Sequence, residues 1–166
     1  MVRPGRDRGM VLQEFAILPW RTVEGNIGHG LEIAGASRRA QEETVQRYVA
    51  LMGLSGFEHK YPYELSGGMR QRVAVARTLA ADPEVVLMDE PFASLDAQTR
   101  NVMQEELVRI ALHERKTIVF VTHSVDEAVI LGDRVVVLNA GRKIAEGLPR
   151  DALEDPSVIE VYLGGT

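Results

Sequence analysis

The amino-acid sequence predicts an α/β fold built on a mainly parallel sheet. Two short runs, EVVLM at residues 84–88 and TIVFVT at residues 117–122, are rich in β-branched residues and almost continuously apolar, as strands covered on both faces are. Between them, residues 97–115 carry one apolar stripe at helical spacing, formed by Met103, Leu107, Ile110 and Ala111. Strand, helix and strand in this order make a βαβ unit.

The chain after the second strand predicts a short helix and a hairpin. Ser124 and Glu127 have the spacing of a capping box, so a helix over SVDEAVIL should begin directly at the end of the strand. Residues 134–147 read as two strands joined by a tight turn. Asp155 followed by Pro156 predicts a last short helix.

Two further helices are predicted in the first half of the chain. Residues 43–54 place Val45, Tyr48, Val49 and Met52 on one face, before Gly53 as a stop signal. The segment LSGGMRQRVAVARTLAADP predicts a helix that opens at two glycines and ends before Pro83. Glycines that open a helix present bare backbone N–H groups at the positive end of the helix dipole, which favours anion binding.

Composition excludes several classes of function. The 166 residues include no cysteine, which rules out disulfides, thiolate metal sites and cysteine nucleophiles. A formal charge of −5 gives no electrostatic footprint for wrapping nucleic acid. No apolar run approaches the roughly 18 residues of a spanning helix, and the basic N-terminus lacks the apolar stretch of a secretory signal. We expect one cytoplasmic domain.

Two adjacent carboxylates, Asp89 and Glu90, follow the first of the two strands. Polar residues at a strand end can simply cap it. Because successive side chains of a strand point to opposite faces, these neighbours are not expected to share a proton and need separate tasks.

The order of these pieces resembles one family. LSGGMRQR, then VVLMDEP, then SLD, then a strand that ends in TH look like the ATP-hydrolysing domain of ABC transporters, over nearly the whole chain from Gln13 to the hairpin. The segments ILPW, ELSGGMRQRVAVARTLA and HSVDEAVILGDRVVVL resemble the nitrate, sulfonate and taurine importer branch. The resemblance implies a partial P-loop NTPase fold with a small helical subdomain at about residues 20–80. Residues 1–19 and 81–147 would be the remaining RecA-like core, and residues 148–166 a C-terminal tail helix.

The resemblance also assigns hydrolysis roles. Asp89 would hold Mg²⁺ as the Walker-B Asp does, and Glu90 would orient and deprotonate the attacking water. His123 would contact the γ-phosphate and Glu90, although a histidine at a strand-to-helix junction can also serve packing alone. Gln13 would touch Mg²⁺ or water and sense the membrane partner; otherwise it is an ordinary exposed glutamine. Trp20, the only tryptophan, is expected in the core, with a contact to a membrane subunit as the alternative.

A second set of residues is implied to act across a dimer. Ser66, Gly67 and Gly68, together with Met69 where many relatives carry Gln, would bind the γ-phosphate of ATP held by the other subunit. Asp96 would lie in a loop that crosses the interface, and it also has the position of a helix N-cap.

The family holds ATP with a Gly-rich loop, G-x-x-x-x-G-K-[ST], and no segment of these 166 residues matches it. We therefore expect a truncated domain that lacks this loop and the first strands, and that neither binds ATP tightly nor hydrolyses it by itself. Its lost strands should leave apolar surface that favours association.

The implied protein is the ATPase subunit of an importer, peripheral on the inner face of the cell membrane, with ATP and Mg²⁺ as cofactors. Its implied partners are a second copy, transmembrane permease subunits and, indirectly, a periplasmic or lipoprotein substrate-binding protein, with no nucleic acid. A non-catalytic interaction module that has lost ATP is the alternative. An ABC ATPase of DNA repair or translation ranks last, because the compact acidic chain has neither long helical insertions nor a basic surface.

Overall fold

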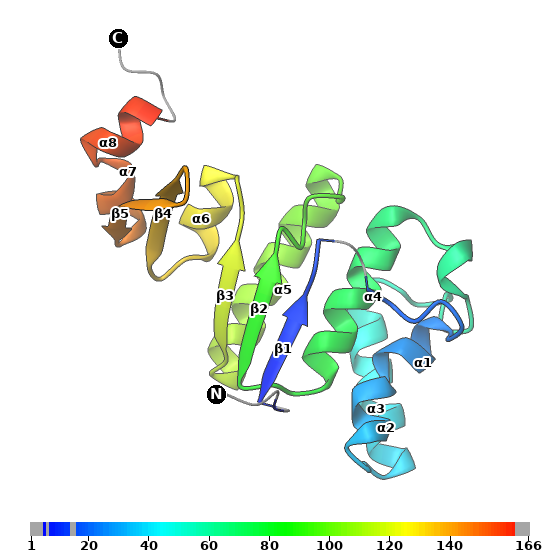
Figure 1. Ribbon diagram of the computed structural model, residues 1–166. Coiled ribbons are helices and arrows are strands. Elements are labelled where there is room, and N and C mark those ends of the chain that lie inside the picture. Colours follow the sequence, from blue (N-terminus) through cyan, green and yellow to red (C-terminus); the bar gives the residue numbers. More distant parts are fainter. Residues whose placement is uncertain (1–4, 6, 14–15, 162–166) are drawn as a thin grey trace. The chain divides into compact units, whose positions relative to one another are not determined.

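The protein is described by a computed structural model that covers residues 5, 7–13 and 16–161 (Figure 1). The chain forms two compact units, residues 1–121 and 122–166, which are described separately. The first contains β1 (Arg8–Val11), α1 (Val23–Ile27), α2 (His29–Ile33), α3 (Arg38–Leu51), a 3₁₀ turn (Pro62–Glu64), α4 (Gly67–Ala80), β2 (Val85–Asp89), α5 (Ala97–Glu114) and β3 (Thr117–Val121). The second contains α6 (Val125–Leu131), β4 (Val135–Asn139), β5 (Arg142–Gly147), α7 (Pro149–Leu153) and α8 (Pro156–Ile159).

The predicted α/β fold with a parallel sheet is confirmed. The strands of the first unit lie in the order β1-β2-β3, and both pairings are parallel. Their register aligns Met10 with Leu87 and Leu87 with Val119. The strands therefore run the same way and end at one edge of the sheet.

One face of this sheet packs into the core of the unit, and the other is open. Val11, Val86 and Met88 are at most 1% exposed, and Figure 1 shows α5 behind β2 and β3. On the opposite face Leu87 is 36% exposed and Val119 49%, so apolar side chains line it. The sequence predicted strands that are covered on both faces, but in the structure these strands are buried on one face only.

The predicted helices form, and three short ones were missed. The helix expected at residues 43–54 begins earlier, at Arg38, because the Ser37 hydroxyl accepts the Ala40 N–H at 3.3 Å and caps it. In α5, Met103, Leu107 and Ile110 are buried as the stripe predicts. The helices α1, α2 and α7 have five residues each, which is too short for a periodic pattern to reveal them.

The expectation that Trp20 packs in the core is wrong, because its side chain is 71% exposed. The nearby Asn26 is fully buried. Its Oδ1 accepts the Leu18 N–H at 2.8 Å, and its Nδ2 donates to the carbonyls of Leu18, Arg21 and Thr22 at 3.0 to 3.1 Å. The side-chain amide of Asn26 thus forms hydrogen bonds with backbone groups at both ends of the turn that contains Trp20.

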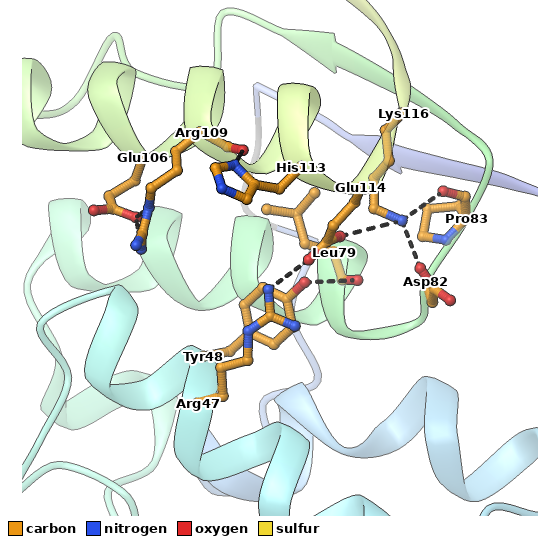
Figure 2. A network of polar contacts seen from close by, with 10 residues as sticks. All are labelled: Arg47, Tyr48, Leu79, Asp82, Pro83, Glu106, Arg109, His113, Glu114 and Lys116. Atoms are coloured by element: carbon orange, nitrogen blue, oxygen red, sulfur yellow. Dashed lines mark hydrogen bonds and ion pairs between the residues drawn. The ribbon is translucent and has the colours of Figure 1, made fainter.

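A buried cation ties together the edge of the sheet where the strands begin (Figure 2). The side chain of Lys116 is 4% exposed, and its ammonium donates to Asp82 Oδ1 at 2.5 Å and to the Pro83 carbonyl at 3.1 Å. Its third partner is Glu114 Oε2 at 3.4 Å. Since Asp82 lies just before β2 and Lys116 just before β3, this cluster fixes where both strands start.

The same cluster reaches the helix α3. Arg47 contacts Glu114 Oε1 at 2.5 Å, and its guanidinium lies 5.3 Å from the centre of the Tyr48 ring. The Tyr48 hydroxyl donates to the Leu79 carbonyl at 3.3 Å (Figure 2), and burial raises the pKa of Tyr48 to about 12. This phenol therefore stays protonated and remains a donor at neutral pH.

The second unit contains the predicted hairpin. β4 and β5 pair antiparallel, and Ala140 and Gly141, with φ of 47° and 76°, make a two-residue turn of the type that matches strand twist. The predicted last helix is α8; residues 162–166 of the expected tail helix lie outside the described residues. Within the part of the chain that the structure describes, no helix is long and apolar enough to cross a bilayer.

The open face of the sheet leads to a prediction on association. We expect the chain to self-associate at high concentration, because parallel sheets normally bury both faces. Lysine at both Leu87 and Val119 should shift the chain towards monomer in sedimentation-velocity runs. Val86→Lys, on the buried face, should unfold it instead. A wild-type chain that is as monomeric as the double variant would contradict this expectation.

Candidate functional site

The polar residues predicted to act in hydrolysis lie at the edge where the strands end. Asp89 is the last residue of β2 and is half-buried, and Glu90 follows it. The register pairs Val11 with Met88, so Gln13, two residues after β1 and exposed, lies at the same edge. This edge is the usual place for ligands in open parallel sheets. The roles of these residues remain predictions.

Glu90 has an unusual backbone. Its φ is 45°, in the left-handed region that residues with a side chain rarely adopt. Its N–H nevertheless donates to the Val121 carbonyl at 2.9 Å, which extends the β2–β3 ladder by one bond. The strand therefore turns sharply at Glu90 while its backbone stays attached to β3. Strained residues of this kind cluster at functional sites.

The helix α4 begins at the two glycines, as predicted. Ser66 is its N-cap, and its hydroxyl accepts the Met69 N–H at 3.2 Å. Ser66 is exposed, whereas Gly67, Gly68 and Met69 are half-buried. The start of α4 therefore presents backbone N–H groups and one hydroxyl at a partly open surface.

Gly68 contacts the loop that follows β2. A Cβ on Gly68 would lie 3.2 Å from Leu95 Cδ2 and 3.5 Å from the Ser94 carbonyl oxygen. Leu95 itself is only 6% exposed, so it has little room to move away. The structure thus brings the SGG segment and the SLD loop of one chain together, which sequence spacing did not predict.

Asp96 at the end of this loop is the N-cap of α5. Its two carboxylate oxygens accept the Thr99 N–H at 3.0 Å and the Thr99 hydroxyl at 2.7 Å. These bonds, the backbone one first, lower the pKa of Asp96 below its usual value, so the cap is charged at neutral pH. The N-cap interpretation is confirmed, while a role across an interface remains a prediction.

Arg72 links α4 to the end of α3. Its Nη1 donates to the Met52 carbonyl at 2.7 Å and to the Gly53 carbonyl at 3.2 Å. Burial lowers the pKa of Arg72, and the Asp96 charge acts in the opposite direction. The first half of α4 is therefore attached to the turn that follows α3.

His123 belongs to the second unit and is exposed. The predicted capping box around it forms only in half: the Ser124 hydroxyl accepts the Glu127 N–H at 3.3 Å. The Glu127 carboxylate binds the Thr122 hydroxyl at 2.5 Å, and that hydroxyl in turn accepts the Ser124 N–H at 2.9 Å. The hydroxyl of Thr122 replaces the direct return bond of a capping box. Sequence reasoning missed Thr122, because nothing in the pattern marks a threonine at the end of a strand.

The donors at the strand ends fit a magnesium ion bound together with a nucleotide. Mg²⁺ keeps several waters and takes one or two protein oxygens plus phosphate oxygens. Asp89 offers a carboxylate and Gln13 an amide oxygen at the same edge of the sheet. Among residues 5, 7–13 and 16–161, no group of three or more His, Asp or Glu side chains could hold a metal.

The backbone of Glu90 gives a prediction on stability. Glu90→Ala and Glu90→Gly both remove the side chain, but only glycine adopts a φ of 45° without strain. The glycine variant should have the higher free energy of unfolding, by about 1–2 kcal/mol. Urea denaturation of the two variants measures the difference. The same pair at Leu87, inside β2, is the control and should favour alanine. Equal stability of the two Glu90 variants would show that the backbone is not strained.

Three kinds of comparison place this geometry among known proteins. The family model described as ABC transporter matches residues 1–93, and a model described as branched-chain amino acid ATP-binding cassette transporter matches residues 142–166. A solved dimeric ATP-binding cassette in a post-hydrolysis state, bound to ADP and Pi, is similar in fold. Its TM-score is 0.80 at 31% identity, and the match covers 87% of this chain and 64% of that one.

Curated relatives agree with the family models. An uncharacterised ABC transporter ATP-binding protein of Methanocaldococcus jannaschii is 61% identical over 82% of this chain and 51% of its own length. A taurine import ATP-binding protein of Rhizobium johnstonii is 48% identical over 86% of this chain and 55% of its own. A nitrate import ATP-binding protein of Synechocystis is 46% identical over 89% and 58%. The chain thus spans about half the length of the curated relatives it matches.

The predicted resemblance is confirmed, both for the family and for relatives named as taurine and nitrate importers. The family model matches more than half of the 166 residues, and the fold neighbour has the same α/β architecture. The chain belongs to the ABC transporter family.

Proposed function

We propose that this chain supplies the hydrolysis and signature residues of the ATP-binding subunit of an ABC importer. The observation that carries the proposal is the Asp89-Glu90 pair at the end of the central parallel strand, in one compact unit with a helix that opens at Ser66-Gly67-Gly68. The names of the taurine and nitrate import relatives support a role in the uptake of a small solute.

Each polar residue at the strand ends receives one task. Asp89, with Gln13, holds a magnesium ion, which neutralises phosphate charge when bound. Glu90 orients the attacking water and takes its proton, and its turned backbone directs the carboxylate away from the strand. His123 contacts the γ-phosphate. Asp89 has the extended backbone of a strand, whereas Glu90 has a left-handed backbone. This difference suits two carboxylates with separate tasks.

The signature residues act on the nucleotide of a second copy. Ser66, Gly67, Gly68 and Met69 offer a hydroxyl and backbone N–H groups at the start of α4, and these groups suit a γ-phosphate. Asp96 continues the same surface, because its loop contacts Gly68. The solved structure with a similar fold is a dimer bound to ADP and Pi, which supports a nucleotide-bridged dimer for this chain. We further propose that residues 20–80 form the helical subdomain, with residues 1–19 and 81–147 in the core and 148–166 as the tail.

The membrane subunits are proposed to bind at the turn that carries Trp20. An indole that is 71% exposed on a turn fixed by four hydrogen bonds from one buried amide is a preorganised anchor for a pocket on a partner. The chain would then lie on the cytoplasmic side of the membrane, and a substrate-binding protein would act through those subunits.

A groove next to this turn is a second part of the proposed docking surface. It encloses about 230 Å³, and its lining includes Arg21 and three carboxylates, those of Glu24, Glu32 and Glu42. Each carboxylate contacts a basic side chain of the chain itself: Glu32 contacts Arg21, Glu42 contacts Arg38 and Glu24 contacts His59. The groove therefore offers a partner polar groups of both charges.

The role of Glu90 is tested in a chimera. A segment of an ABC ATPase that carries a G-x-x-x-x-G-K-[ST] loop is fused ahead of residue 1, because phosphoryl transfer needs a phosphate-binding loop and these 166 residues contain no such sequence. The chimera should hydrolyse ATP. Glu90→Gln should lower the rate by about 10²- to 10⁴-fold, as expected when a general base is removed, while ATP binding persists.

Two controls make this experiment decisive. Glu105→Gln, which changes an exposed carboxylate of α5, should leave the rate unchanged. The 166-residue chain alone should bind ATP only weakly in equilibrium dialysis. Hydrolysis that survives in the Glu90→Gln chimera would refute the assigned role, and tight ATP binding by the chain alone would refute its dependence on the loop.

The docking surface is tested by single-site cross-linking. Because the chain has no cysteine, Trp20→Cys introduces a unique thiol, and Leu112→Cys is a control matched in exposure, at 72% against 71%. A maleimide-benzophenone group at position 20 should cross-link to a membrane subunit encoded beside the gene and co-expressed with the chain. The same group at position 112 should not. Equal labelling from both positions would show that Trp20 is not the anchor.

A further inference from the structure

Three residues of the second unit close a ring of hydrogen bonds around His123. The Thr122 hydroxyl donates to Glu127 Oε2 at 2.5 Å, and the oxygen of this hydroxyl accepts the Ser124 N–H at 2.9 Å. The Glu127 N–H closes the ring on the Ser124 hydroxyl at 3.3 Å. The Thr122 hydroxyl therefore connects the Glu127 carboxylate to the backbone of Ser124, on the other side of His123.

The ring is partly removed from water, which strengthens it. Glu127 is 7% exposed in the first turn of α6, and Thr122 and Ser124 are half-buried. Hydrogen bonds from hydroxyls to carboxylates are shorter and stronger than those between neutral groups. His123 itself is exposed, so its imidazole projects from a backbone that is fixed on either side.

Capping of α6 does not require the Thr122 hydroxyl. The N-cap bond is made by Ser124, whose hydroxyl accepts the Glu127 N–H, and this bond would form with any residue at position 122. Thr122 instead connects the carboxylate of Glu127 to the backbone next to His123. The helix cap and the brace on His123 are thus separable by substitution.

We propose that Glu127 is a positioning residue for His123 and acts on it through the hydroxyl of Thr122. The inference rests on the proposed function, in which His123 contacts the γ-phosphate. Glu127 does not touch the nucleotide; it fixes the backbone from which the imidazole reaches it. Accurate placement matters here, because a catalytic group displaced by about 1 Å can cost roughly 10²-fold in rate.

The first test measures the mobility of His123 in the 166-residue chain. Thr122→Val removes the hydroxyl and keeps the shape, and Thr122→Ser restores the hydroxyl. Ser124→Ala removes the bond that caps α6 and closes the ring, but leaves both bonds of the Thr122 hydroxyl in place. In ¹⁵N relaxation, Thr122→Val should lower the order parameter of the His123 amide from about 0.85 to below roughly 0.6. Thr122→Ser should leave it unchanged. An order parameter that stays at the wild-type value in Thr122→Val would overturn the proposal.

The second test measures kinetics in the ATP-hydrolysing chimera. Thr122→Val should lower kcat about 10- to 100-fold with the KM for ATP unchanged, since placement and not binding is lost. Thr122→Ser should restore kcat. If Ser124→Ala lowers kcat as much as Thr122→Val, the ring serves only the helix and the proposal fails. A wild-type chimera without ATPase activity would refute the proposed function instead, and the relaxation measurement would still decide the brace.

Discussion

The parallel pairing of β1, β2 and β3 is the constraint on which the rest of the first unit depends. Parallel strands must all end at one edge, so a residue that follows one strand is brought near a residue that follows the next. This pairing gathers Gln13, Asp89 and Glu90, although more than 70 residues separate the first from the others. The opposite edge has a different task. There the buried ammonium of Lys116 joins the turns that lead into β2 and β3 and so fixes their relative register.

The edge where the strands end combines rigid and strained parts. The backbone of Glu90 turns into the left-handed region but keeps its hydrogen bond to the Val121 carbonyl, so the chain turns without loss of pairing. The start of α4 is held by Arg72 and by the contact between Gly68 and Leu95. Side chains that must meet a phosphate from fixed directions need this kind of support, because phosphoryl transfer depends on positioning more than on covalent chemistry.

Sequence reasoning recovered the elements whose signals are local and repeated. The apolar runs predicted β2 and β3, and the glycine pair predicted the start of α4. The stripe of Met103, Leu107 and Ile110 predicted α5. It failed where a single long-range contact decides the outcome. Trp20 was expected inside because tryptophan is large and apolar, but its side chain is exposed. The polar Asn26 is buried, because its amide bonds to the backbone of Leu18.

The contacts around the site were beyond pattern reasoning for the same reason. No spacing rule links Gly68 to Leu95, which lie 27 positions apart, or shows that Thr122 stands between Ser124 and the carboxylate of Glu127. Such contacts depend on how helices, strands and loops pack together. Short sequence patterns do not show this packing. The family resemblance predicted which residues act, while the structure shows which residues contact and support them.

The contact of Gly68 with Leu95 also constrains how this protein could change over evolutionary time. A Cβ at position 68 would lie 3.2 Å from Leu95 Cδ2, so a side chain there would require Leu95 to shift by a few tenths of an ångström. Because Leu95 is only 6% exposed, such a shift would disturb the packing around it. A side chain at position 68 is therefore expected to be accepted more readily when residue 95 is shorter than leucine, and the two positions should vary together.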